Sequence, residues 1–136
     1  MKFIGILSVL FFATFATAEI TLENTTQKDS FQTQSSSHYF NFGRVLANTM
    51  STTTYTVTNT GSAYLQFASA NIWGIDFSAN HNCFSGIYPG QRCNFQIRYW
   101  PYNVGVHSGQ FEIRFYGPTP NPEIIHVNLW GEAVRY

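Results

Sequence analysis

Apolar and polar side chains alternate along short segments from Tyr39 to the end of the chain, and Gly, Pro and Asn separate these segments. Successive side chains of a β-strand point to opposite faces of a sheet, so a period of two is typical of strands that bury one face. No segment shows the period of a long helix. We expect seven strands, of which the fourth has the weakest pattern: Tyr39–Val45, Thr53–Asn59, Tyr64–Ala68, Asn71–Phe77, Arg92–Trp100, Gln110–Tyr116 and Glu123–Ala133.

The alternation also predicts the hydrophobic core, because one face of these segments carries large apolar side chains. Each such side chain contributes roughly 1.5 to 3 kcal/mol when it is buried, so together they can hold a domain of this size. Seven strands in about a hundred residues predict an all-β fold, a seven-stranded immunoglobulin-like antiparallel β-sandwich over residues 39–136. The expected core residues are Tyr55, Val57, Leu65, Phe67, Phe95, Ile97, Tyr99, Phe111, Ile113, Phe115, Ile125, Val127 and Leu129.

The start of the chain, MKFIGILSVLFFATFATA, follows a different pattern. Lys2 precedes an apolar run from Phe3 to Phe15, and the small residues of Ala16-Thr17-Ala18 suit cleavage before Glu19. This is the pattern of a secretory signal peptide over residues 1–18. The run is shorter than the roughly 20 apolar residues that span a bilayer, and no charged flank follows it, so we expect no stable membrane span after signal cleavage.

Residues 19–38, EITLENTTQKDSFQTQSSSH, are polar and lack sustained alternation. This composition predicts a flexible polar N-terminal arm. Ile20 and Leu22 nevertheless alternate with polar neighbours, which leaves one alternative open. In that alternative the segment is a donor strand that pairs with the sheet edge of a neighbouring subunit.

The charge of the chain limits the class of partner. Cleavage after residue 18 removes Lys2 and leaves six Lys and Arg residues against seven Asp and Glu, a formal charge of 6 − 7 = −1. Phosphate binding needs clustered positive charge, whereas these arginines are scattered along the chain, so we expect no nucleic acid partner. Few charges together with many Thr, Ser, Asn and aromatic residues favour an exported β protein, either periplasmic or secreted.

Several segments match a known pattern in order and spacing: YTVTNTGSAYLQF (55–67), Phe77, Cys83, YPGQRCNFQIRYWP (88–101), GVHSGQFEI (105–113) and VNLWGEA (127–133). Over about Phe40 to Val134 the chain resembles the abnormal-spindle/Hydin-type immunoglobulin-like domains. In bacteria these domains occur as choice-of-anchor repeats of exported proteins, and they are related to the PapD-like and major-sperm-protein sandwiches. The resemblance implies an immunoglobulin-like fold and a non-enzymatic role in interaction, although a fold alone does not name the partner.

The chain has two cysteines, Cys83 and Cys93. Export makes a disulfide their default state, and closing so short a loop contributes on the order of 2 to 3 kcal/mol. A redox pair would normally have the C-x-x-C spacing, which is much shorter. A zinc site could add His81 or His107, yet the short paired spacing of zinc ligands is missing. We therefore predict a local disulfide staple and neither a metal nor a cofactor.

Catalytic side chains are present, but they form no recognisable motif. The sequence contains no nucleophile elbow, no metal-binding histidine pair and no phosphate-binding glycine loop, so we expect a protein that is not an enzyme. Residues that are distant in sequence could still converge in space, which leaves catalysis as an alternative. The residues in question are His38, His81, His107, His126, Asp29, Asp76 and Glu112.

A candidate binding surface follows from the outward positions of three predicted strands. In an immunoglobulin topology the third, sixth and seventh strands share a sheet. Aromatic side chains interleaved with hydrogen-bonding groups on its outer face suit a protein or a cell-envelope glycan. In the alternative, these side chains only make cross-strand pairs or lie beneath the N-terminal arm. The candidate residues are Tyr64, Gln66, Arg114, Tyr116, His126, Asn128 and Trp130, with Glu112 beside them.

The other two tryptophans are placed less firmly by the pattern. Trp100 faces outward on the opposite sheet, and Trp73 belongs either to the core or to a loop. Two hypotheses of function follow. The first is an exported non-enzymatic immunoglobulin-like module that recognises a protein or envelope glycan. The alternative is a structural subunit of a surface or periplasmic assembly, an oligomer joined through strand edges or the N-terminal arm.

Overall fold

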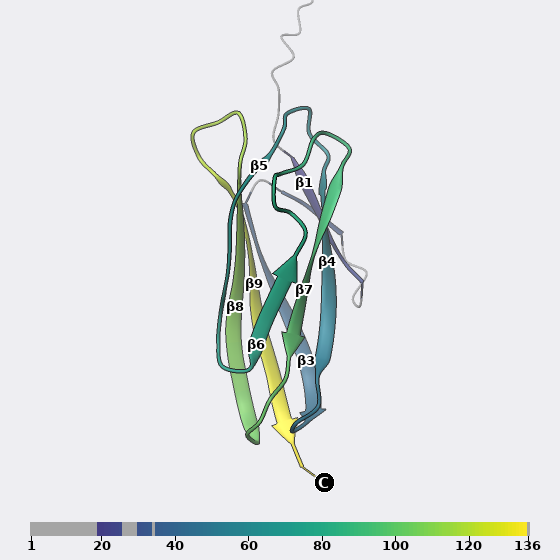
Figure 1. Ribbon diagram of the computed structural model, residues 1–136, viewed down its shortest axis with the longest axis vertical. Helices are drawn as coiled ribbons and strands as arrows, with labels where there is room; N and C mark the ends of the chain where they lie inside the picture. The colour runs from purple at the N-terminus through teal and green to yellow at the C-terminus, as the bar shows by residue number, and fades with distance from the viewer. Residues whose placement is uncertain (1–18, 26–29, 34, 136) are drawn as a thin grey trace, which may run out of the picture.

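The protein is a sandwich of two β-sheets that face each other along the long axis of the molecule (Figure 1). The computed structural model describes residues 19–25, 30–33 and 35–135, and none of them forms a helix that could cross a membrane. One sheet has the strand order β2-β1-β4-β7-β6 and the other has the order β3-β9-β8-β5. The strands are β1 (Ile20–Asn24), β2 (Ser30–Thr33), β3 (Ser35–Leu46), β4 (Ser51–Asn59), β5 (Gln66–Trp73), β6 (Phe77–His81), β7 (Arg92–Tyr99), β8 (Gly105–Tyr116) and β9 (Glu123–Val134).

The predicted all-β immunoglobulin-like sandwich is confirmed, but the predicted strand count of seven is too low. Five predicted strands correspond to β3, β4, β7, β8 and β9, although β3 begins at Ser35 and β8 at Gly105, several residues before the predicted starts. The third and fourth are wrong in position, since β5 continues to Trp73 and β6 begins only at Phe77. Asp76, with a φ of 72°, lies in the turn between them. The sheets are also not purely antiparallel, because β3 runs parallel to β9.

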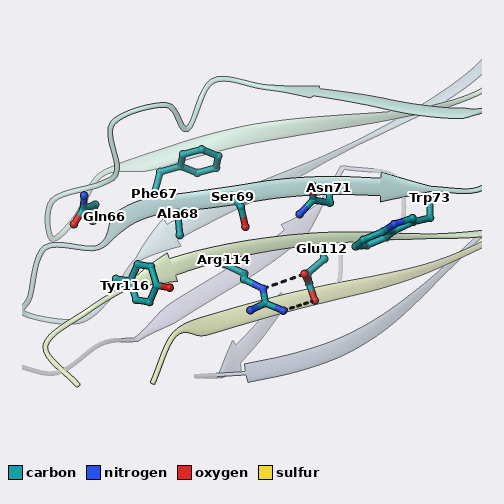
Figure 2. A pocket seen from close by; sticks show the side chains of 9 residues that line it. All are labelled: Gln66, Phe67, Ala68, Ser69, Asn71, Trp73, Glu112, Arg114 and Tyr116. Atoms are coloured by element: carbon teal, nitrogen blue, oxygen red, sulfur yellow. Dashed lines mark hydrogen bonds and ion pairs between the residues drawn. The ribbon is translucent and has the colours of Figure 1, made fainter. Parts of the chain in front are cut away.

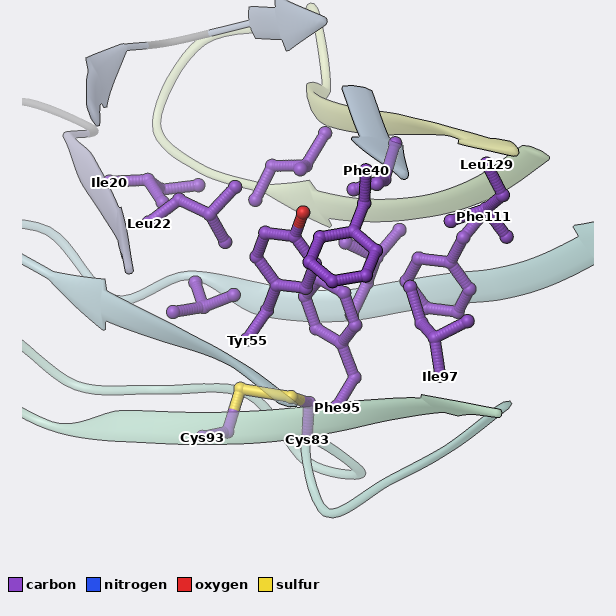
Figure 3. Close-up of a cluster of buried hydrophobic side chains, with 14 of the residues drawn as sticks. Ile20, Leu22, Phe40, Tyr55, Cys83, Cys93, Phe95, Ile97, Phe111 and Leu129 are labelled. Carbon is purple, nitrogen blue, oxygen red and sulfur yellow. A yellow bond between two sulfur atoms is a disulfide. The ribbon is translucent and has the colours of Figure 1, made fainter. Parts of the chain in front are cut away.

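The core lies between the sheets and contains the predicted apolar residues. All of them are buried except Phe67, which is half-buried and packs against the cluster. Aromatic rings connect the two layers: Tyr55 stacks on Phe95 at a centroid distance of 5.2 Å, and Phe95 stacks on Phe111 of the other sheet at 4.5 Å (Figure 3). The aromatic excess of the sequence therefore serves mainly as packing.

The N-terminal segment corrects an expectation. Most of the described part of the predicted flexible arm is strand, in β1, β2 and the start of β3. β1 pairs antiparallel with β4, with Leu22 opposite Val57. Ile20 and Leu22 are fully buried and join the core (Figure 3). Their alternation thus marks a strand of the chain's own sheet, not a donor strand for a neighbour. The predicted signal peptide and residues 26–29 lie outside the described residues, and the domain boundaries stay a prediction.

The predicted disulfide is present between Cys83 and Cys93, whose Cα atoms are 5.2 Å apart. It joins the loop that follows β6 to β7 within one sheet, and both residues are buried (Figure 3). The bridge is therefore a local staple and does not connect the two sheets.

Candidate functional site

A groove runs along the outer face of the four-stranded sheet, between β5 and β8 (Figure 2). Its volume is about 560 Å³, and we call it the β5–β8 groove. Trp73 and Tyr116 lie at its opposite ends, with Glu112 and Arg114 between them (Figure 2). The lining residues are Gln66, Phe67, Ala68, Ser69, Asn71, Trp73, Glu112, Arg114 and Tyr116.

A β-bulge at Ala68 decides which side chains of β5 reach this groove. Phe67 pairs with Phe115 and Ser69 pairs with Arg114, so Ala68 is one extra residue in β5. An extra residue shifts the alternation by one position and turns the following side chains over. Beyond the bulge, Ala70 and Ile72 pack against the core. Ser69, Asn71 and Trp73 therefore share the outer face with Gln66, and Trp73 is 51% exposed.

The backbone at Trp73 is held close to β8. Trp73 pairs with Gln110, and the next residue of β8 toward its start is Gly109. A Cβ on Gly109 would lie 2.4 Å from the carbonyl oxygen of Trp73, so only glycine permits this approach. The backbone of Trp73 is thus fixed at the end of a strand that packs tightly against its neighbour.

An ion pair occupies the middle of the groove. Arg114 Nε donates to Glu112 Oε1 at 3.0 Å, and Arg114 Nη2 donates to Glu112 Oε2 at 3.3 Å (Figure 2). On the far side of the carboxylate, His126 Nε2 lies 3.4 Å from Glu112 Oε2, and His126 Nδ1 lies 3.2 Å from Gln110 Nε2. Hydrogen bonds to the Glu112 carboxylate raise the pKa of Arg114 above its ordinary value. The Glu112 carboxylate is therefore held by Arg114 and by His126.

The structure brings together four of the predicted surface residues. Gln66, Arg114 and Tyr116 line the groove, and His126 joins them through Glu112. Their strands share one sheet, as predicted from the immunoglobulin topology. Whether they bind a partner stays a prediction.

The other three predicted surface residues lie outside the groove. Tyr64 precedes β5, where its ring lies 4.5 Å from that of Tyr88 and its hydroxyl donates to the Ser85 carbonyl. Asn128 donates to the backbone carbonyl of His38 at 3.4 Å. Trp130 lies on β9, opposite Ser108, and is half-buried.

Trp73, Asn71 and Ser69 are groove residues that the sequence prediction missed. A signal for them exists, because two successive apolar residues, Phe67 and Ala68, precede a polar–apolar alternation in shifted phase. Such a doubled apolar position is what a bulge leaves in a strand pattern. Trp73, predicted as core or loop, is instead an outward residue of β5, whereas Trp100 follows β7 in the other sheet and is 50% exposed.

A second polar cluster includes the buried Tyr99 and the partly buried His107 and Asp76. The Tyr99 hydroxyl lies 2.6 Å from His107 Nδ1, and His107 Nε2 lies 3.8 Å from Asp76 Oδ2. Burial, and then the nearby carboxylates of Asp76 and Glu132, raise the pKa of Tyr99. A fully buried phenol that keeps its proton is a structural hydrogen-bonding group. Within residues 19–25, 30–33 and 35–135, no group of three or more His, Cys, Asp or Glu could hold a metal ion.

Comparison with known families agrees with this architecture. A family model described as the HYDIN/CFA65/VesB-like, Ig-like domain matches residues 33–130. The chain belongs to this family. The match is consistent with the resemblance noted from the sequence, and it makes the protein an Ig-like domain module. A comparison with curated protein sequences finds no match.

Solved structures share the fold of this Ig-like domain at low identity. The VesB protease of Vibrio cholerae is 18% identical with a TM-score of 0.62, over 73% of this chain and 32% of that one. The secreted serine protease VesC of Vibrio cholerae is 18% identical with a TM-score of 0.51, over 68% and 21%. The ASH/PapD-like domain of human CEP192 is 9% identical with a TM-score of 0.59, over 97% and 98%.

These likenesses show the fold alone. The chain spans about a third of the VesB protease chain and about a fifth of the VesC chain. One relative is described as secreted, and the buried disulfide of this chain is consistent with export.

Proposed function

We propose that this Ig-like domain is an exported binding module that holds a protein or envelope glycan in the β5–β8 groove and has no enzymatic activity of its own. The observation that carries this proposal is the arrangement in Figure 2, in which Trp73 and Tyr116 flank the Glu112–Arg114 pair. Half of each aromatic side chain is exposed, at 51% and 49%. Trp, Tyr and Arg are the side chains that most often dominate binding energy.

The charged pair of the groove is held by contacts within the domain itself. The side chains of the groove come from two paired strands, and the ion pair and His126 fix the charged groups. Ordering a free side chain on binding costs about 0.5 to 1.5 kcal/mol, so a site whose groups are already fixed avoids much of this cost. The fixed Glu112–Arg114 pair therefore supports a role in binding for this face of the sheet.

Export is supported by three observations of different kinds. The sequence predicts a signal peptide over residues 1–18. The Cys83–Cys93 disulfide is typical of an oxidising compartment. VesC, which shares the fold, is described as a secreted protease. A periplasmic or secreted location follows as part of the proposal.

The test is capture of a partner by the chain from Glu19 to Tyr136, immobilised and exposed to the envelope fraction and medium of its own source. The double variant Trp73→Ser/Tyr116→Ser removes both ends of the groove. Trp100→Ser is the matched control, because Trp100 is equally exposed on the other sheet. We expect mass spectrometry to identify components that the wild type and the control retain and the double variant loses. Equal recovery by all three proteins would contradict the proposal.

A structural role through strand edges is the second candidate. In the described part of the chain β5 has a hydrogen-bonded neighbour on one side only, β8, so its other edge can accept a strand. Deletion of residues 19–37 cannot test this role, because it removes core residues Ile20 and Leu22. Sedimentation of the intact chain is the better test: a monomer at high concentration would contradict assembly through this edge, whereas a concentration-dependent oligomer would support it.

A further inference from the structure

We infer that the ligand of the β5–β8 groove is an uncharged, linear oligosaccharide that lies along β5 and β8. This inference rests on the proposed function, because it names the class of partner for the same groove. It follows from the spacing of the two aromatic side chains, from the balance of charge and from the polar groups between the aromatic side chains. We call these polar residues the floor of the groove: Ser69, Asn71, Glu112 and Arg114.

The spacing requires an extended ligand. Tyr116 pairs with Gln66 at one end of β5, and Trp73 pairs with Gln110 at the other end. At about 3.3 Å for each strand residue, the two aromatic positions are roughly 20 Å apart. A single sugar ring cannot contact both of them. A chain of several rings can stack one ring on Trp73, another on Tyr116, and cross the floor between them (Figure 2).

The floor offers donors and acceptors in close alternation. Ser69 lies directly across from Arg114, and Asn71 lies directly across from Glu112. Hydroxyl, guanidinium, amide and carboxylate groups therefore lie side by side. Sugar hydroxyls both donate and accept, and neighbouring hydroxyls can bind a carboxylate or a guanidinium through two parallel bonds. The Glu112 contacts use two of the five N–H groups of Arg114, which leaves donors for a ligand.

The aromatic side chains complement the remaining surface of a sugar. One face of a pyranose ring presents C–H groups, and these pack on the electron-rich face of an indole or a phenol. An extended polar chain with periodic C–H faces matches polar residues between two exposed aromatic side chains. An apolar ligand would fit this arrangement poorly. It would displace water from the polar groups of the floor and offer them no hydrogen bonds in return, which costs free energy.

The balance of charge favours a neutral ligand. Glu112 and Arg114 are the charged residues that line the groove, and they neutralise each other through two hydrogen bonds. An anionic glycan would be attracted by Arg114 but repelled by the carboxylate of Glu112, which is buried immediately beside Arg114. A cationic ligand would be attracted by Glu112 but repelled by Arg114. Neutral hydroxyl groups can use both partners without a net charge penalty.

A folded protein fits this groove less well. A standard protein interface buries about 800 Å² on each partner and has a core depleted of charged residues. Here an ion pair lies at the centre, and the hollow of about 560 Å³ has the size of a small-ligand site, which is typically about 300 to 1,000 Å³. The observations therefore favour the glycan over the protein within the proposed function.

The test uses calorimetric titration of the chain from Glu19 to Tyr136 with neutral linear hexamers of glucose, N-acetylglucosamine, mannose and xylose. A hexamer of galacturonic acid serves as the anionic comparison. We expect at least one neutral hexamer to bind more tightly than the anionic one and than its own monomer. Trp73→Ser and Tyr116→Ser should each weaken binding about tenfold or more, whereas Trp100→Ser should leave it unchanged. Thermal unfolding of each variant confirms that the fold is intact.

The outcomes separate this inference from the proposed function. The inference is overturned if no neutral hexamer binds at millimolar concentration, if the anionic hexamer binds as tightly, or if the two groove variants bind like the wild type. If capture from the source still depends on Trp73 and Tyr116 after enzymatic removal of glycans, the groove binds a protein, and only the glycan assignment fails. If capture depends on neither residue, the proposed function fails as well.

Discussion

Replacement of Gly131 in β9 by alanine places a methyl group in space that the Tyr99 ring occupies. A Cβ at this position would lie 2.4 Å from Tyr99 Cε2 and 2.8 Å from both Cδ2 and Cζ. The ring cannot easily move away. It is fully buried, stacks on Phe77 at 4.8 Å, and its hydroxyl lies 2.6 Å from His107 Nδ1. We therefore expect Gly131→Ala to destabilise the sandwich.

The expected magnitude follows from opposing effects. Alanine in a strand is ordinarily favoured over glycine by roughly 0.5 to 1 kcal/mol, because glycine loses more backbone freedom on folding. Overpacking of a dense core costs about 1 to 3 kcal/mol, and displacement of the ring would lose the Tyr99–His107 hydrogen bond, worth about 1 kcal/mol. The net loss in the free energy of unfolding is then about 1 to 3 kcal/mol, or roughly 4 to 12 °C in Tm for a chain of this size.

The assay is urea and thermal unfolding of the chain from Glu19 to Tyr136, followed by circular dichroism. The informative comparison is a double-mutant cycle with Tyr99→Leu, which removes the ring that the new methyl group would meet. In that background we expect Gly131→Ala to cost little or even to stabilise. The reasoning is refuted if the cost is the same in both backgrounds, or if Gly131→Ala alone leaves the stability unchanged.

Three further predictions concern stability. Burial raises the pKa of Glu123, so the folded chain binds the carboxyl proton more tightly than the unfolded chain does. The stability that this group contributes is therefore complete below about pH 4.5 and is lost as the pH rises through the raised pKa. Glu123→Gln should therefore be more stable than wild type in urea at pH 7, with the difference vanishing near pH 4; a constant difference would contradict this. Leu22→Ala should cost about 2 to 4 kcal/mol in the same assay and the exposed control Glu23→Ala less than about 0.5, whereas equal costs would exclude β1 from the folded unit. Replacing Cys83 and Cys93 together with alanine should cost about 2 to 3 kcal/mol and abolish the effect of dithiothreitol on unfolding; continued sensitivity to the reductant would refute a role for this bridge.

The parts of the fold that were predictable from the sequence are those with uninterrupted alternation. Phe95, Ile97 and Tyr99 follow one another at every second position of β7, and all three are buried. A central strand with a long regular pattern identifies its own inward face, because a shift by one residue would expose the whole set. The shared sheet of β5, β8 and β9 was predictable for another reason, because the immunoglobulin topology assigns these strands to one sheet.

The N-terminal strand was not predictable in this way. In β1 only Ile20 and Leu22 alternate, and two apolar residues in a polar segment do not distinguish a strand from an irregular chain. What makes β1 a strand is the free edge of β4, where Leu22 meets Val57 across the pair. The paired residues are far apart in the sequence, so the stabilising contact is absent from any local pattern.

The groove shows why knowing the outward face of a sheet is not enough to locate a site. Tyr64 and Tyr116 were both assigned to that face, yet only Tyr116 lies in the groove, because Tyr64 precedes β5 and its ring lies against that of Tyr88. The bulge at Ala68 decides the rest. Without this extra residue, Ile72 would face outward and Trp73 would enter the core, since one step reverses the alternation. The aromatic end of the groove thus depends on a backbone irregularity, which is why composition and period predicted the sandwich but left Trp73 unplaced.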